Sequence, residues 1–126
     1  MEKKELKDSI KYFSNRAFKT KKRKILCFIL RNHSYYRYSL YKNYCKSYYY
    51  KNKNKLFYLI AMYKYSKYST RINVQIKCQK FMSMFYFEHY NIVINQHSII
   101  GSGIRCIGNN CIGGNDRGAT ILGNNV

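Results

Sequence analysis

Apolar and aromatic side chains recur at helical intervals through the first seventy residues. The spacing of apolar residues from 10 to 18 predicts a first helix with an apolar stripe, capped by Asp8 or Ser9. Tyrosines between 35 and 48 recur every three or four residues and predict an aromatic helix face whose hydroxyl groups reach water. The pattern breaks at 52–54 and then resumes. This part of the chain therefore predicts three short helices.

The last third of the chain follows a six-residue period. An apolar residue returns at Ile94, Ile100, Cys106 and Ile112, and the phase resumes at Leu122 after a four-residue interruption. This period fits neither the 3.6 residues of a helix nor the alternation of a single strand. Three such units form one triangular coil of about 18 residues, in which the first residue of each unit points inward. The pattern therefore predicts an incomplete parallel β-helix.

Charge and glycine divide the chain near residue 80. The 24 Lys and Arg residues outnumber the 5 Asp and Glu residues, and the whole excess of +19 lies in residues 1–80, while all seven glycines lie after residue 100. Such a positive charge is typical of proteins that bind nucleic acids, because Lys and Arg neutralise phosphates. However, Lys, Tyr, Ile and Asn make up 59 of the 126 residues, and all four have codons rich in A and T. We therefore favour codon bias, and expect no nucleic-acid partner.

Cysteine spacing and the lack of long apolar runs indicate a cytoplasmic protein without metal. The five cysteines form no CxxC pair and have no histidine at zinc-ligand spacing, so free thiols and no metal site are expected. No signal peptide and no membrane span are recognisable. The run of five basic residues within 19–24 suggests either a localisation or anionic-lipid patch, or a solvated stretch between helices. We favour the solvated stretch.

The C-terminal motifs resemble the hexapeptide-repeat acyltransferases, which have a left-handed β-helix. Within that group they look most like serine acetyltransferases and the related O-acetyltransferases of surface-polysaccharide clusters. The matching stretches are Phe85-Tyr86-Phe87-Glu88-His89-Tyr90, Ile92-Val93-Ile94-Asn95, Ile99-Ile100-Gly101, Ile112-Gly113-Gly114-Asn115-Asp116-Arg117 and Leu122-Gly123-Asn124-Asn125-Val126. The resemblance implies an α+β fold: a basic, Tyr-rich helical region over 1–70, followed by an incomplete left-handed parallel β-helix over 71–126.

The resemblance also implies an activity and a site. The activity is that of a serine O-acetyltransferase, acetyl transfer from acetyl-CoA as co-substrate to a hydroxyl group, in a homotrimer; a sugar hydroxyl is the alternative acceptor. The implied site consists of His89 as catalytic base and Gln75 as its partner; Gly113, Gly114 and Asn115 at the cofactor; and Asp116 and Arg117 at the acceptor. A histidine suits this task because a group with a pKa near 6.5 can take up and return a proton at neutral pH.

Gln75 stands where the family has a carboxylate, in a Val-Asp-Ile-His type of motif. An amide can orient an imidazole by a hydrogen bond, but it cannot compensate the charge of the imidazolium. This departure argues against efficient serine acetylation and leaves an acceptor sugar of a capsule or exopolysaccharide open. Since the units stop at Val126, before the coils that complete a family member, we expect a truncated reading of a longer gene. A non-catalytic basic binding module, or an inactive fragment, is the alternative from another class.

Overall fold

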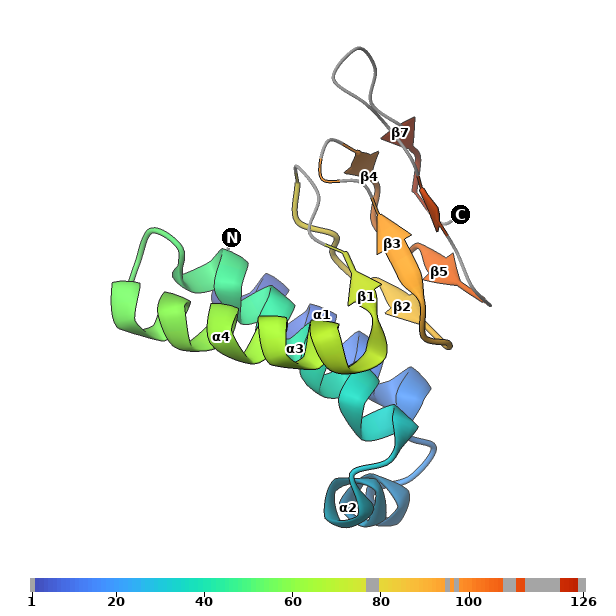
Figure 1. Cartoon of the computed structure of the whole chain (residues 1–126). Helices are drawn as coiled ribbons and strands as arrows, with labels where there is room; N and C mark the ends of the chain where they lie inside the picture. Colours follow the sequence, from blue (N-terminus) through green and yellow to red (C-terminus); the bar gives the residue numbers. More distant parts are fainter. Residues whose placement is uncertain are drawn as a thin grey trace.

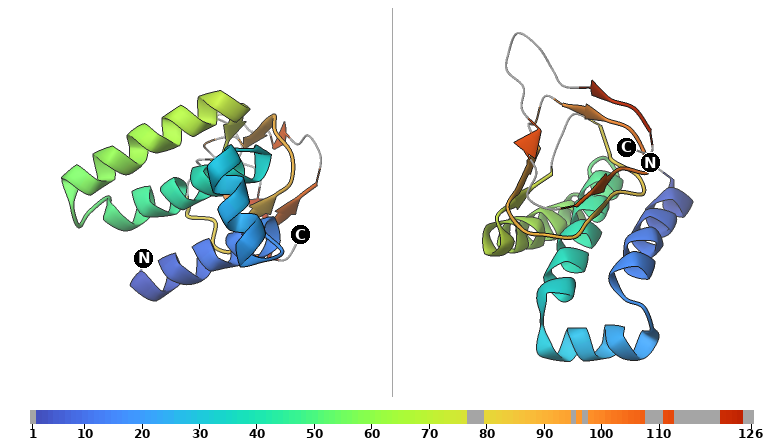
Figure 2. Two further views of the ribbon diagram at one scale, coloured as in Figure 1. Left: turned by 90° about the horizontal axis from the view of Figure 1, so that it is seen from below. Right: turned by 90° about the vertical axis from the view of Figure 1, so that its right-hand side faces the viewer.

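The computed structural model describes residues 2–76, 80–94, 96, 98–107, 111–112 and 121–124. Four helices precede the strands: α1 (Lys3–Ala17), α2 (Lys21–Leu30), α3 (His33–Tyr50) and α4 (Lys55–Ile72). Figure 1 shows α1, α3 and α4 side by side, with α2 across one end. The same arrangement is visible in Figure 2, where α2 joins the ends of α1 and α3. The predicted number of three helices is therefore wrong.

Side-chain caps define where these helices begin. Thr20, Asn32 and Asn54 each accept a hydrogen bond from the backbone N–H three residues further on, which starts α2, α3 and α4. The predicted cap at Asp8 or Ser9 is wrong, because α1 already begins at Lys3. The chain has no proline and no glycine before residue 101, so only these polar caps interrupt the helical pattern.

Tyrosines form the centre of the core rather than a solvent-exposed helix face. Tyr41 and Tyr44 are fully buried and stack on each other with their ring centroids 5.6 Å apart. The Tyr41 hydroxyl donates to the Met82 carbonyl (2.7 Å) and accepts from the Phe85 N–H (3.2 Å). The prediction that the hydroxyl groups of this face reach water is therefore wrong for Tyr41. A buried phenol needs a partner, and the irregular backbone before the second strand supplies it.

Short parallel strands follow the helices. They are β1 (Val74–Gln75), β2 (Tyr86–Phe87), β3 (Ile92–Ile94), β4 (Ile99–Ile100), β5 (Arg105–Cys106), β6 (Cys111–Ile112) and β7 (Ile121–Leu122). They form three small sheets with the orders β1-β3-β6, β2-β5 and β4-β7, and every pair is parallel. One apolar cluster runs from α1 through α3 to β5, so helices and strands share a core.

The predicted incomplete left-handed parallel β-helix is wrong. The chain is mainly helical, and the strands that the structure describes have only two or three residues each. Paired residues are 18 apart in β1–β3 and β3–β6, 19 apart in β2–β5 and 22 apart in β4–β7. The 22-residue spacing contains the four-residue interruption seen in the sequence, whereas the 19 residues of β2–β5 depart from the 18 of a regular coil. The inward positions Ile94, Ile100 and Cys106 are nevertheless buried.

Candidate functional site

The segment that carries His89 runs along the end of β2 and is held on one side by β5. The Tyr86 N–H donates to the Ile104 carbonyl (3.0 Å), and the Glu88 N–H donates to the Cys106 carbonyl (3.1 Å). The Glu88 carboxylate lies 3.6 Å from the Arg105 guanidinium. These contacts hold the backbone up to residue 88, directly before His89.

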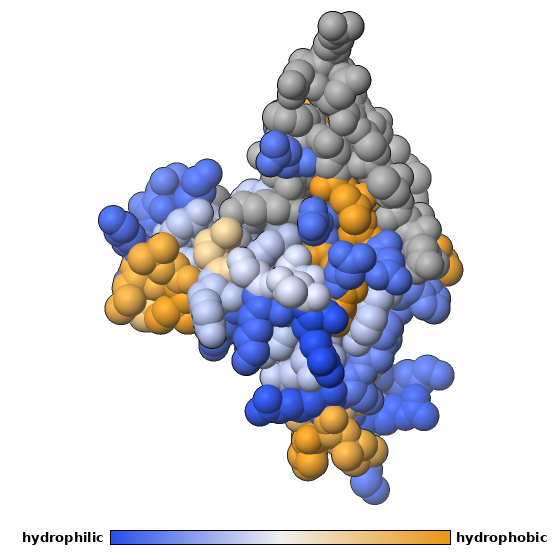
Figure 3. All heavy atoms as spheres, in the orientation of Figure 1, coloured by the Kyte–Doolittle hydropathy of each residue, from blue (hydrophilic) through white to orange (hydrophobic). Residues whose placement is uncertain are grey.

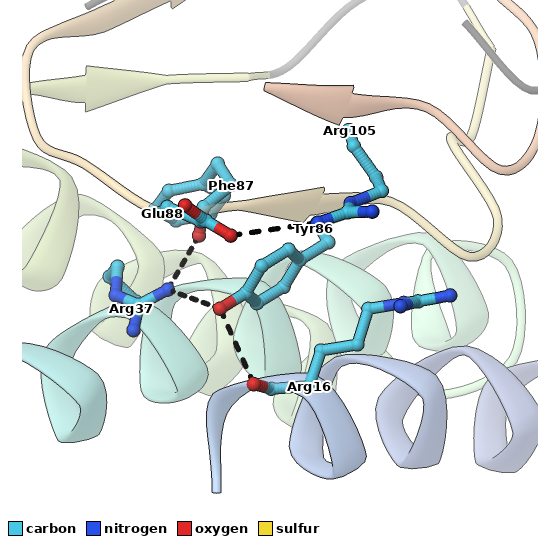
Figure 4. Close-up of polar contacts among 6 residues, drawn as sticks. All are labelled: Arg16, Arg37, Tyr86, Phe87, Glu88 and Arg105. Atoms are coloured by element: carbon cyan, nitrogen blue, oxygen red, sulfur yellow. Dashed lines mark hydrogen bonds and ion pairs between the residues drawn. The ribbon is translucent and has the colours of Figure 1, made fainter. Parts of the chain in front are cut away.

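Arg37 of α3 holds the same segment from the other side. Arg37 is 5% exposed, and its guanidinium donates from Nη1 to the Phe87 carbonyl (2.6 Å) and to the Tyr86 hydroxyl (3.1 Å). The Tyr86 hydroxyl in turn donates to the Arg16 carbonyl of α1 (3.5 Å), as Figure 4 shows. No carboxylate contacts Arg37 in the described part of the chain, and its Nε has no hydrogen-bond partner there. A buried cation thus joins α1 and α3 to β2.

His33, at the start of α3, completes this support. Its Nε2–H donates to the Glu88 carbonyl (2.8 Å), and its ring stacks on Tyr90 with the centroids 4.2 Å apart. Burial lowers the pKa of His33; the bond to the Glu88 carbonyl raises it, and the nearby Arg37 and His89 lower it further. A neutral His33 can carry only one ring proton, and the Glu88 carbonyl requires that proton on Nε2.

His89 itself is exposed to solvent at the bend after β2. The adjacent Glu88 carboxylate is turned toward Arg105, so it does not serve His89 as a charged partner. The backbone on both sides of His89 is held: the Glu88 carbonyl accepts from His33, and the Asn91 N–H donates to the Ile72 carbonyl (3.3 Å). The result is an accessible imidazole on a fixed backbone, which can accept a proton from a bound molecule.

Gln75 lies elsewhere. It is exposed on β1, opposite Val93 of β3, and lines a groove of about 500 Å³ between α4 and these strands. Ser69 and Thr70 of α4 also line this groove, but His89 does not. No hydrogen bond joins Gln75 to His89 among the residues that the structure describes. The structure therefore does not bring together the two predicted catalytic residues.

The other predicted site residues, Gly113, Gly114, Asn115, Asp116 and Arg117, lie outside the described residues. Conversely, the sequence did not indicate His33 or Arg37. Asn32 marks the start of a helix, but nothing in the sequence pattern shows that the helix would meet a strand more than fifty residues later. The contact arises from tertiary packing alone.

Comparison with known proteins adds no relative. No family model matches the chain, and no curated protein and no solved structure matches it significantly. Within the described ranges, no group of three or more His, Cys, Asp or Glu side chains is placed to hold a metal ion. No helix there has both the length and the apolar character needed to cross a membrane.

Proposed function

We propose that this protein transfers an acetyl group from acetyl-CoA to a hydroxyl group, with His89 as the general base. The observation that carries the proposal is the exposed His89 imidazole on a backbone held from both sides, by β5 and by α3. The Phe85–Tyr90 motif, which resembles the acetyltransferases, contains His89, and the Ile92–Asn95 motif follows it in the sequence. The proposal includes a homotrimer in the cytoplasm.

The reaction needs one proton to move twice. His89 takes the proton of the acceptor hydroxyl as its oxygen attacks the thioester carbonyl. The carbon–sulfur bond then breaks, and the imidazolium returns the proton to the departing CoA thiolate. His33 and Arg37 are positioning residues in this scheme, because they hold the carbonyl groups of Glu88 and Phe87 and touch neither reactant.

The remaining predicted residues bind the two reactants. Gly113, Gly114 and Asn115 are assigned to acetyl-CoA, because they resemble the loop beside the acetyl-CoA cleft of the acetyltransferases. Asp116 and Arg117 are assigned to the acceptor. Gln75 makes no hydrogen bond to His89 in the structure, so it does not orient the imidazole in this scheme. The acceptor is L-serine, with a sugar hydroxyl of a capsule or exopolysaccharide as the alternative.

Release of the CoA thiol from acetyl-CoA tests the proposal, with the full-length chain and either L-serine or a sugar as acceptor. We expect His89→Asn to lower the rate by about 100-fold or more, as for loss of a general base. His97→Asn is the matched control, because it removes a histidine to which no role is assigned. Equal rates for His89→Asn and the unchanged chain, or no CoA release with any acceptor, would refute the proposal.

A further inference from the structure

Helix α2 turns its apolar stripe outward. Ile25, Leu26, Ile29 and Leu30 occupy one face of this helix and are 62%, 54%, 72% and 65% exposed. Figure 3 shows a hydrophobic cluster at the end of the molecule that α2 forms. No residue of α2 is buried. Isolated apolar residues are common on protein surfaces, but a continuous stripe is not, and it indicates a partner.

The orientation of α2 is set by the contacts of its other face. Phe28 meets Phe18, Tyr35 and Tyr38 at centroid distances of 6.0, 5.2 and 5.7 Å. Cys27, next to it, packs against the core cluster. Because these aromatic contacts hold the inner face, the outward stripe is a fixed feature of the folded chain.

A cationic groove adjoins this stripe. It has a volume of about 530 Å³, lies between α1 and α2, and contains five lysines among its lining residues: Lys7, Lys11, Lys19, Lys21 and Lys24. Lys24 donates to the Ser14 hydroxyl (3.1 Å) and lies 4.8 Å from the centre of the Tyr38 ring. The same lysine borders an apolar hollow of about 450 Å³ beside Ile25 and Ile29. Positive charge and exposed hydrocarbon therefore meet at one side chain.

We propose that α2 docks this protein onto the surface of an anionic lipid bilayer. Lipid phosphates would occupy the cationic groove, while the outward stripe of α2 enters the boundary between headgroups and acyl chains. Lysine suits this position, because its stem packs on hydrocarbon while its ammonium group stays among the phosphates. This inference is independent of the proposed acetyl transfer.

Charge favours a bilayer over a second copy of the chain. No acidic residue occurs between Asp8 and Glu88, so α2, α3 and α4 contain none. Two copies joined through α2 would bring like charges together, which costs free energy, whereas an anionic surface attracts them. Docking through α2 also leaves β4 and β7 on the side away from the bilayer, because they lie at the opposite end of the molecule (Figures 1 and 2).

Helix α4 offers a comparison. Leu56, Leu59 and Ile60 are also exposed there, at 64%, 53% and 43%. The groove that Ile60 lines has a volume of about 240 Å³ and two lysines, Lys46 and Lys64, whereas five lysines line the groove between α1 and α2. The groove beside this face therefore has fewer lysines, and substitutions on α4 are matched controls for those on α2.

The first experiment locates the contact by fluorescence. The chain has no tryptophan, so Ile29→Trp introduces a single indole on α2, and Leu59→Trp does the same on α4. Vesicles of phosphatidylcholine with about one third phosphatidylglycerol are added to each full-length variant. We expect the emission of the Ile29→Trp protein to shift to shorter wavelength and that of the Leu59→Trp protein to stay unchanged. Equal shifts, or no shift at Ile29→Trp, would overturn the proposal.

The second experiment separates the two contributions by co-sedimentation with the same vesicles. Loss of Lys21 and Lys22 together, as Gln, should weaken binding about 30-fold at low salt. The same change at Lys3 and Lys4, which lie on α1 away from α2, should alter it less than about threefold. Ile29→Ser should weaken binding about tenfold or more, and Leu59→Ser should not.

Three results would contradict the assignment. If vesicle binding is unchanged after Lys21 and Lys22 are replaced, these lysines do not contribute the electrostatic attraction that the proposal requires. Binding that is unchanged in Ile29→Ser would indicate a general polyanion site without insertion. A fall in molecular mass in sedimentation equilibrium for Ile29→Ser, with vesicle binding unchanged, would assign the stripe to a contact between copies of the chain.

Discussion

Tyr41→Phe isolates the hydrogen bonds that join α3 to the segment before β2. The substitution keeps the ring and removes only the hydroxyl, so it leaves two buried backbone groups without their partner: the Met82 carbonyl, 2.7 Å away, and the Phe85 N–H, 3.2 Å away. An orphaned buried polar group costs about 1–3 kcal/mol. Since the hydroxyl itself no longer needs to be desolvated, we expect a net loss of about 3 kcal/mol of unfolding free energy.

Urea unfolding followed by far-ultraviolet circular dichroism measures this loss. With a slope of about 2 kcal/mol per molar urea, the midpoint should fall by about 1.5 M at an unchanged slope. Tyr63→Phe is the control: this tyrosine is 71% exposed, so the change should stay within about 0.5 kcal/mol. Amide exchange at Phe85 should also become faster in Tyr41→Phe. A midpoint and an exchange rate equal to those of the unchanged chain would refute the reasoning.

Two further predictions concern pH and backbone packing. Because the pKa of His33 is lowered in the folded chain, the unfolded chain binds more protons, and the free energy of unfolding should fall as pH drops below about 6.5. His33→Gln should make the free energy of unfolding, measured at several pH values, depend less on pH. An unaltered pH dependence would contradict the prediction. A Cβ at Gly101 would lie 2.6 Å from the Gly123 carbonyl and 2.5 Å from the Asn124 side chain, so Gly101→Ala should destabilise the chain by about 1–3 kcal/mol. Gly123→Ala, where a Cβ would meet nothing within 4 Å, should leave the denaturation midpoint unchanged, and equal midpoints for both variants would argue against the predicted clash.

The six-residue period correctly predicted which side chains are buried, but it did not predict how the strands are arranged. Ile94, Ile100 and Cys106 are all buried, because an apolar residue after each polar corner can only turn inward. The same pattern did not predict how long the strands are or how evenly they repeat. Strand length and spacing depend on how many backbone hydrogen bonds form between segments some eighteen residues apart, and a local pattern contains no information on those bonds.

The candidate site was predictable in one part only. His89 was identified through the motif around it, and the structure places it at an accessible bend. Arg37 and His33 could not be identified, because a histidine or an arginine on a helix is usually a solvated side chain. Their contacts with Phe87 and Glu88 link residues some fifty positions apart.

Sequence alone accounts for the local features of this protein: helical periodicity before residue 70, apolar positions at six-residue intervals after 92, and a positive charge confined to the first eighty residues. These depend on neighbouring side chains and on the backbone preferences of single residues. The direction in which each face points follows from packing instead. Phe28 packs on Tyr38 while it stays 38% exposed, and Ile29 faces solvent. The Tyr41 hydroxyl donates to the Met82 carbonyl inside the core and therefore does not reach water. Packing decides such choices because the helices and strands share a single core, and the position of each helix in that core sets which of its side chains are buried.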